Sequence, residues 1–182
     1  GIFARSLTGD LGIETRNGSI RNDVDDRSTR FVARNIDLVA SGAVGASTAD
    51  FSGDLYIDTA ETGRLVAFSG APRLAGVFIT EATGSLSVLL AVALGGGVRL
   101  RTLYDPDSAR ESILVLPGGV TLGALPVPFG AVAASGAVEI LSAMDVWAPA
   151  GTVIIGERVT IRAAYGQNSA APEGVYVYLG GA

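Results

Sequence analysis

The chain has 182 residues, 48% of them hydrophobic and only 17% charged, with a net charge of −5 and neither His nor Cys. These counts exclude His-based catalytic triads, thiol nucleophiles, disulfides, and metal sites built from His or Cys. All 13 basic residues are Arg, and the acidic excess offers no cationic stripe for a phosphate backbone, so we expect no nucleic-acid partner.

The length suits one domain, residues 1–182, with a substantial core. The longest apolar run, 86–98, is interrupted by three glycines and is too short to cross a bilayer, so we expect no transmembrane segment. The first residue is Gly and not Met. We therefore expect this chain to be a segment of a longer protein.

A short phrase of a turn followed by a strand recurs along the chain. It is clearest at 8–13 (TGDLGI), 52–57 (SGDLYI) and 83–88 (TGSLSV), with looser copies at 95–100, 135–140 and 157–161. Such recurrence is typical of repeat architectures, which form long surfaces more often than single pockets. With roughly 20 residues in each coil and about 4.8 Å between coils, the chain would form about nine coils and a rod a little over 40 Å long.

Hydrophobic residues alternate with polar ones wherever strands are expected. In 31–39, Ile36 and Leu38 lie on one face, and the same alternation recurs in 98–103, 159–162 and 175–179. Residues 81–94 could also form a helix, but Gly84 and the β-branched residues favour a strand. We predict an all-β chain that folds as a parallel β-helix (β-solenoid). The spacing of strand starts also fits an antiparallel β-sandwich, which stays open as the alternative.

Three segments interrupt this pattern and are expected to project as loops. Segment 22–30 is dense in charge, 103–111 is polar, and 116–130 carries three of the chain's prolines, which cannot donate to a strand ladder. No composition change marks a domain boundary, so the loops belong to one solenoid.

Four phrases, at 17–23, 31–47, 53–70 and 77–88, resemble the filamentous-haemagglutinin-like adhesins, which are large repetitive exoproteins of Gram-negative bacteria. The resemblance is clear over residues 5 to 102. Over the remainder it extends only to the general character of the sequence. It implies a right-handed parallel β-helix, secretion, and a role in adhesion, filaments or biofilm. The secretion domain typical of that family is not seen in this sequence, so the resemblance leaves the export route open.

Carboxylates are the main catalytic candidates that remain. Asp54 and Asp58, with Glu81 stacked near either, could form a carboxylate pair of the kind that cleaves polysaccharides. The simpler interpretation is structural: Asp54 would cap a turn, Asp58 would lie on a solvated strand face, and Glu81 would accept hydrogen bonds from turn amides.

The densest acidic cluster contains Asp23, Asp25 and Asp26. Calcium takes six to eight oxygen ligands, and this segment supplies several of them. However, the cluster lacks the glycine spacing of known calcium loops and is flanked by arginines. A solvated loop is therefore favoured over a calcium site, and no other cofactor is expected.

Val175, Val177 and Leu179 alternate with tyrosines in the last predicted strand. The end strands of a solenoid present unpaired backbone groups, and this chain has no Lys with which to protect them. These three residues are therefore candidates for self-association. Few aromatic residues could stack on sugars, and edge packing is the simpler role for them. They are Tyr56, Tyr104, Trp147, Tyr165, Tyr176 and Tyr178.

Together these features predict a non-catalytic structural or adhesive module of a secreted or cell-surface exoprotein. We expect it to self-associate, end to end or side by side, into a filament or surface layer, and a cell-surface glycan is the other partner considered. Two alternatives stay open: a β-helix polysaccharide lyase or glycosidase, and a carbohydrate-binding β-sandwich module.

Overall fold

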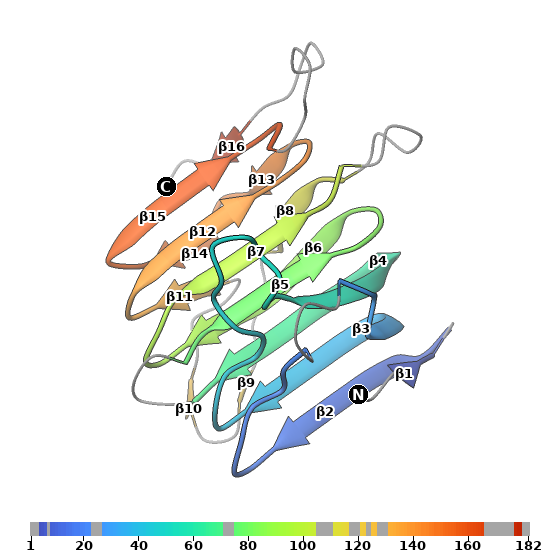
Figure 1. Cartoon of the computed structure of the whole chain (residues 1–182). Helices are drawn as coiled ribbons and strands as arrows, with labels where there is room; N and C mark the ends of the chain where they lie inside the picture. The colour runs from blue at the N-terminus through green and yellow to red at the C-terminus, as the bar shows by residue number, and fades with distance from the viewer. Residues whose placement is uncertain are drawn as a thin grey trace.

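The structure is a computed structural model that describes residues 4–6, 8–22, 27–70, 75–104, 111–116, 121–122, 125–126, 131–165 and 177–179. All helices and strands assigned in these residues are β-strands. In the described part of the chain, no helix is long and apolar enough to cross a membrane. Figure 1 shows the strands stacked in chain order from the N-terminal to the C-terminal end. The all-β prediction is confirmed, and residues 81–94 lie in strands and a turn instead of a helix.

The strands are β1 (Ala4–Arg5), β2 (Asp10–Thr15), β3 (Phe31–Ala40), β4 (Leu55–Ser69), β5 (Val77–Glu81), β6 (Leu86–Ala93), β7 (Val98–Thr102), β8 (Ile113–Val115), β9 (Thr121–Leu122), β10 (Leu125–Pro126), β11 (Ala131–Ala134), β12 (Ala137–Leu141), β13 (Val146–Ala148), β14 (Val153–Ile155), β15 (Arg158–Arg162) and β16 (Val177–Leu179).

Parallel pairing organises these strands into three ladders. The first ladder contains β1, the first parts of β3 and β4, then β5, β7, β12 and β15. The second contains β2, the later parts of β3 and β4, then β6, β11 and β14. The third joins the start of β6 to β8, β13 and β16. Among the described residues only β9 and β10 pair antiparallel, so the β-sandwich alternative is wrong and the β-solenoid is confirmed.

The solenoid has about 5 turns, so the prediction of about nine coils was wrong. One reason is that the coils are longer than assumed: Phe31 pairs with Ile57, which pairs with Glu81, so these coils take 26 and 24 residues. A second reason is insertion. Val77 pairs with Val98, but Val98 pairs with Val138, so the later coil is nearly twice as long.

The core is a set of aliphatic columns inside the coils. Leu55, Ile79, Leu100 and Ile140 lie in register on successive strands, and all four are fully buried. The alternation predicted for 31–39 and 98–102 is present, with the apolar residues inside. Each such side chain contributes roughly 1.5–3 kcal/mol by leaving water, which is what holds the coils together.

The corner between the first two ladders requires one glycine. β3 and β4 run continuously through this corner, and their pairing shifts register between Ala33 and Asn35. A Cβ atom at Gly63 would clash with the carbonyl oxygen of Arg34 in the coil below. Gly63 therefore allows the two backbones to approach closely where the strands bend.

Most of the predicted loop residues lie outside the described chain. In the first two predicted loops, 22–30 and 103–111, the residues outside the described chain are 23–26 and 105–110. In the third, 116–130, the described part is residue 116 and the strands β9 and β10. The division into domains, and the winding direction implied by the resemblance, therefore remain predictions.

Candidate functional site

An insertion that the sequence did not indicate covers the outer face of the first ladder. Val44 pairs with Val77, and Leu55 pairs with Ile79, so residues 46–54 are extra chain between two adjacent core positions. We call residues 46–54 the covering loop. In Figure 1 it is the teal segment that crosses in front of the later strands. The loop departs at Gly45, whose φ is 74° and whose place admits no side chain because a Cβ would meet a backbone carbonyl of β5.

The covering loop is held by its own polar groups. Gly53 N donates to Thr48 Oγ1 at 2.8 Å, and Ser52 donates through both N and Oγ to Asp50 Oδ1, at 3.2 and 2.8 Å. The bonds from Ser52 lower the pKa of the exposed Asp50 carboxyl. The loop thereby holds Phe51 at a φ of 64°, a left-handed conformation that is strained for a bulky side chain.

Phe51 lies against two arginines of β7, which is two strands further along the first ladder than β4. The guanidinium carbons of Arg99 and Arg101 are 4.7 and 4.3 Å from the centre of the Phe51 ring, and Arg99 is also 5.4 Å from the Phe78 ring. The Tyr165 ring meets Phe51 edge-on, with centres 6.2 Å apart. Cation–π attraction thus fastens the loop to the sheet.

Asp54 is the last residue of the covering loop and forms a buried ion pair. Its carboxylate contacts Arg99 Nη2, and Thr80 Oγ1 donates to it at 2.8 Å. Arg101 Nε in turn donates to Thr80 Oγ1 at 3.2 Å. Burial raises the pKa of Asp54, and the Arg99 guanidinium offsets part of that rise. The structural interpretation of Asp54 as a turn cap was incomplete, because its main partner lies on a distant strand.

Glu81 points into the solenoid. It lies in register between Ile57 and Thr102 and is fully buried. Its carboxylate accepts hydrogen bonds from Thr59 N at 2.8 Å and Thr59 Oγ1 at 3.0 Å. Burial raises the pKa of Glu81 well above its ordinary value. Glu81 does accept a backbone amide, as the sequence suggested, but that amide belongs to a buried strand instead of an exposed turn.

The three carboxylates considered for an enzyme do not share a cavity. Asp54 faces outward beneath the covering loop, whereas Glu81 faces inward, with Thr80 and Glu81 as successive residues on opposite sides of β5. Asp58 follows the inward Ile57 and is half-buried on the outer side. A polysaccharide bond could not meet Asp54 and Glu81 together in this arrangement.

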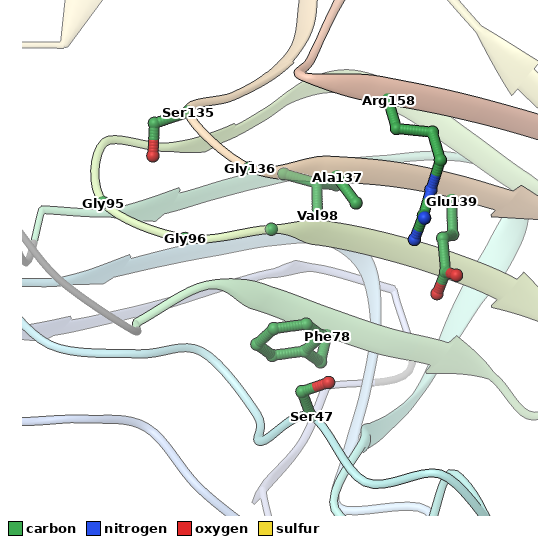
Figure 2. Close-up of a pocket in the computed structure, with 11 residues that line it drawn as sticks. Ser47, Phe78, Gly95, Gly96, Val98, Ser135, Gly136, Ala137, Glu139 and Arg158 are labelled. Carbon is green, nitrogen blue, oxygen red and sulfur yellow. The ribbon is translucent and has the colours of Figure 1, made fainter.

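Two hollows lie on the outer face of the first ladder beside the covering loop. Their volumes are about 540 and 370 Å³, and Glu139 and Arg158 line both of them. Figure 2 shows the larger hollow, with Glu139 and Arg158 projecting from neighbouring strands and Phe78 and Ser47 on the opposite side. The smaller one is also lined by Phe51, Arg162 and Tyr165. We call the two hollows together the outer groove.

Charge along the outer groove comes from side chains in register. Arg99 pairs with Glu139, which pairs with Thr160, while Arg101 pairs with Leu141, which pairs with Arg162. Arg99 Nη1 also approaches Glu139 Oε2 at 4.0 Å. Asp54 offsets the charge of Arg99, and among the charged residues that line the two hollows Arg158 and Arg162 outnumber Glu139. The groove is therefore slightly basic on a chain whose net charge is −5.

The remaining predicted site residues are not tested. Asp23, Asp25 and Asp26, the calcium candidates, lie outside the described residues, and within the described chain no group of three or more His, Cys, Asp or Glu could hold a metal ion. Val175 also lies outside the described residues. Val177 and Leu179 belong to β16, the last strand of the third ladder.

Sequence reasoning missed the groove because its parts are far apart in the chain. Phe51, Arg99 and Tyr165 meet only after several coils have stacked. A usable signal was the alternation of Arg99 and Arg101 with buried residues, which places both on the outer face. Nothing in the local sequence indicated that the covering loop would fold over them.

The fold defines this chain as a parallel β-solenoid protein. No family model, no curated protein and no solved structure matches it. The class is therefore established by the strand pairing alone.

Proposed function

We propose that this chain is a non-catalytic structural and adhesive module of a secreted or cell-surface protein, and that it associates with a second copy through the open ends of its ladders. Cell-surface display, filament formation and a role in biofilm come from the resemblance to haemagglutinin-like exoproteins. A β-solenoid is compatible with such a role because stacking extends its core without a new fold.

One observation carries the proposal: among the described residues, the last side chain of a core column is exposed. Val77, Val98, Val138 and Val159 lie in register. The first three are buried, with 0%, 1% and 0% of their surface exposed, but Val159 is 43% exposed. Within the described residues no strand pairs with β15 on its far side. A copy stacked there would bury Val159 and pair the backbone of β15.

The neighbouring edge strand supports the same surface. β14 pairs only with β11 among the described residues, and its partly buried Ile154 continues the core column of the buried Val132. Large apolar side chains beside unpaired strand edges are the usual mark of a surface that another strand covers. Val177 and Leu179 belong to β16, which ends the third ladder among the described residues, and their part in self-association is still a prediction.

The test compares lysine at the open end with lysine elsewhere. Val159→Lys adds a charge to the edge strand, whereas Leu94→Lys adds one at an equally exposed position in the turn after β6. We expect wild type and Leu94→Lys to form concentration-dependent oligomers in sedimentation velocity, and Val159→Lys to stay monomeric. Circular dichroism checks that both variants fold. A wild-type chain that stays monomeric at all concentrations, or a Val159→Lys variant that oligomerises normally, would reject self-association.

A glycan partner completes the adhesive part of the proposal. An adhesive module needs a surface that reads an external ligand, and the outer groove is the concave polar surface that the described residues offer. Because Asp54 and Glu81 are buried and face opposite ways, this groove supports binding better than cleavage.

A further inference from the structure

We propose that the outer groove binds a polysaccharide that carries anionic groups, carboxylates or sulfates. The inference rests on the adhesive part of the proposed function and names its ligand class. It does not depend on self-association, because the groove-lining side chains of β15 project from the outer face, whereas Val159 of the same strand belongs to the core column.

The size of the groove suits a few sugar rings. Its two hollows, of about 540 and 370 Å³, fall within the usual range of small-ligand sites, and they share Glu139 and Arg158. The floor crosses successive strands of the first ladder, so its polar groups recur with the spacing of the strands, about 4.8 Å. A chain molecule can therefore contact several coils at once.

The arginines supply the anion recognition. Arg158 and Arg162 are exposed and lie four residues apart on one face of β15, which separates them by about 13 Å. Each guanidinium can hold a carboxylate or a sulfate through two parallel hydrogen bonds. Two such groups at this separation fit a polymer with repeated charges better than a single small anion.

Glu139 favours a saccharide over a polyanion that contains no sugar. Its side chain is 37% exposed in the middle of the groove, and Arg99 contacts one of its oxygens at 4.0 Å. A carboxylate at that place repels a polyphosphate but accepts hydrogen bonds from sugar hydroxyls. Thr160 and Ser47 add hydroxyl groups to the lining. The combination of outer arginines with a central acceptor is therefore typical of a site for an acidic saccharide.

Aromatic rings close one end of the groove. Phe51 and Tyr165 both line the smaller hollow and pack edge-on against each other. Rings of this kind pack against the apolar faces of sugars. Gly95, Gly96 and Gly136 line the larger hollow, where the absence of side chains leaves room for a ligand.

The experiment uses the monomer variant Val159→Lys as background, so that binding is measured apart from self-association. Polygalacturonate and heparin are titrated by calorimetry, with dextran as the neutral saccharide and polyphosphate as the polyanion without sugar. We expect binding to at least one acidic polysaccharide and none to dextran or polyphosphate. Binding of polygalacturonate would show that carboxylates suffice, whereas binding of heparin without polygalacturonate would point to sulfate groups.

Matched variants locate the site. Arg158→Gln with Arg162→Gln should weaken binding at least about tenfold, since each removes charge-assisted hydrogen bonds. Arg16→Gln with Arg34→Gln removes the same charge at exposed positions near the other end of the solenoid and should leave affinity within about twofold. Equal losses in both pairs, equal binding of polyphosphate, or no binding of either acidic polymer would overturn the proposal. A chain that oligomerises but binds neither polymer would retain the structural role and lose the adhesive one.

Discussion

The two sides of the first ladder each bury a carboxylate, and they compensate it differently. Outside, Asp54 has the Arg99 guanidinium as a countercharge beneath the covering loop. Inside, the hydrogen-bond partners of Glu81 among the described residues are the neutral amide and hydroxyl of Thr59. An ion pair can form outside because the inserted covering loop brings Asp54 to Arg99 and shields the pair from water. The interior column has no room for such an insertion, so the protonated form of Glu81 is favoured instead.

The largest expected effect comes from removing the outer countercharge. Arg99→Met keeps much of the side-chain volume but leaves Asp54 buried without its guanidinium. We expect the free energy of unfolding in urea to fall by about 3–5 kcal/mol, the usual cost of breaking a buried pair. Arg16→Met, whose side chain is 86% exposed, should leave the urea midpoint unchanged. A loss no larger than that of Arg16→Met would mean that Asp54, like Glu81, does not need an arginine as its countercharge.

The second effect concerns pH and Glu81. Because the folded-state pKa lies above the ordinary value of 4.5, the folded chain holds this proton more tightly than the unfolded chain. The resulting stability is complete below pH 4.5 and is lost as pH rises towards and through the folded pKa. The loss amounts to about 1.4 kcal/mol for each pH unit between the unfolded and folded pKa values. Glu81→Gln should flatten this part of the stability profile, measured by urea unfolding from pH 4 to 8.

Asp54→Asn is the comparison variant for Glu81→Gln. Asp54→Asn changes a group whose rise in pKa is offset by Arg99, but it also leaves Arg99 buried without a countercharge. It should therefore lower stability across the whole pH range, whereas Glu81→Gln should alter mainly the slope above pH 4.5. If Glu81→Gln keeps the wild-type slope, Glu81 is not the neutral carboxyl that its surroundings imply.

The smallest effect comes from the cover itself. Phe51→Ala removes the ring from Arg99 and Arg101, and cation–π contacts of this kind contribute roughly 0.5–1 kcal/mol each. Alanine keeps the Cβ atom, so the strain at a φ of 64° remains, and the two lost contacts predict a decrease of about 1–2 kcal/mol in urea unfolding. Phe51→Tyr keeps the ring and should behave as wild type. An equal loss in Phe51→Tyr would show that the ring is not the relevant contact.

Local pattern predicted the strands well and the coils poorly. Alternation at 31–39 and 98–102 identified which residues face the core, because period two is a property of any pleated strand. The count of coils failed because it assumed about 20 residues in each coil, whereas Phe31 pairs with Ile57 and Val98 pairs with Val138. The site failed for a related reason: Asp54 was visible as a candidate, but its partner Arg99 was not.

The sequence by itself determined the all-β class, the inward face of each strong strand, and the absence of His and Cys chemistry, since these follow from composition and from near neighbours in the chain. The tertiary structure alone decided the register between coils. That register places Phe51 over Arg99, joins Glu139 to Arg158 in one groove, and sends Glu81 inward while Asp54 stays outside. The physical reason is that stacking brings together residues far apart in sequence, and the insertions that set their alignment leave no periodic mark.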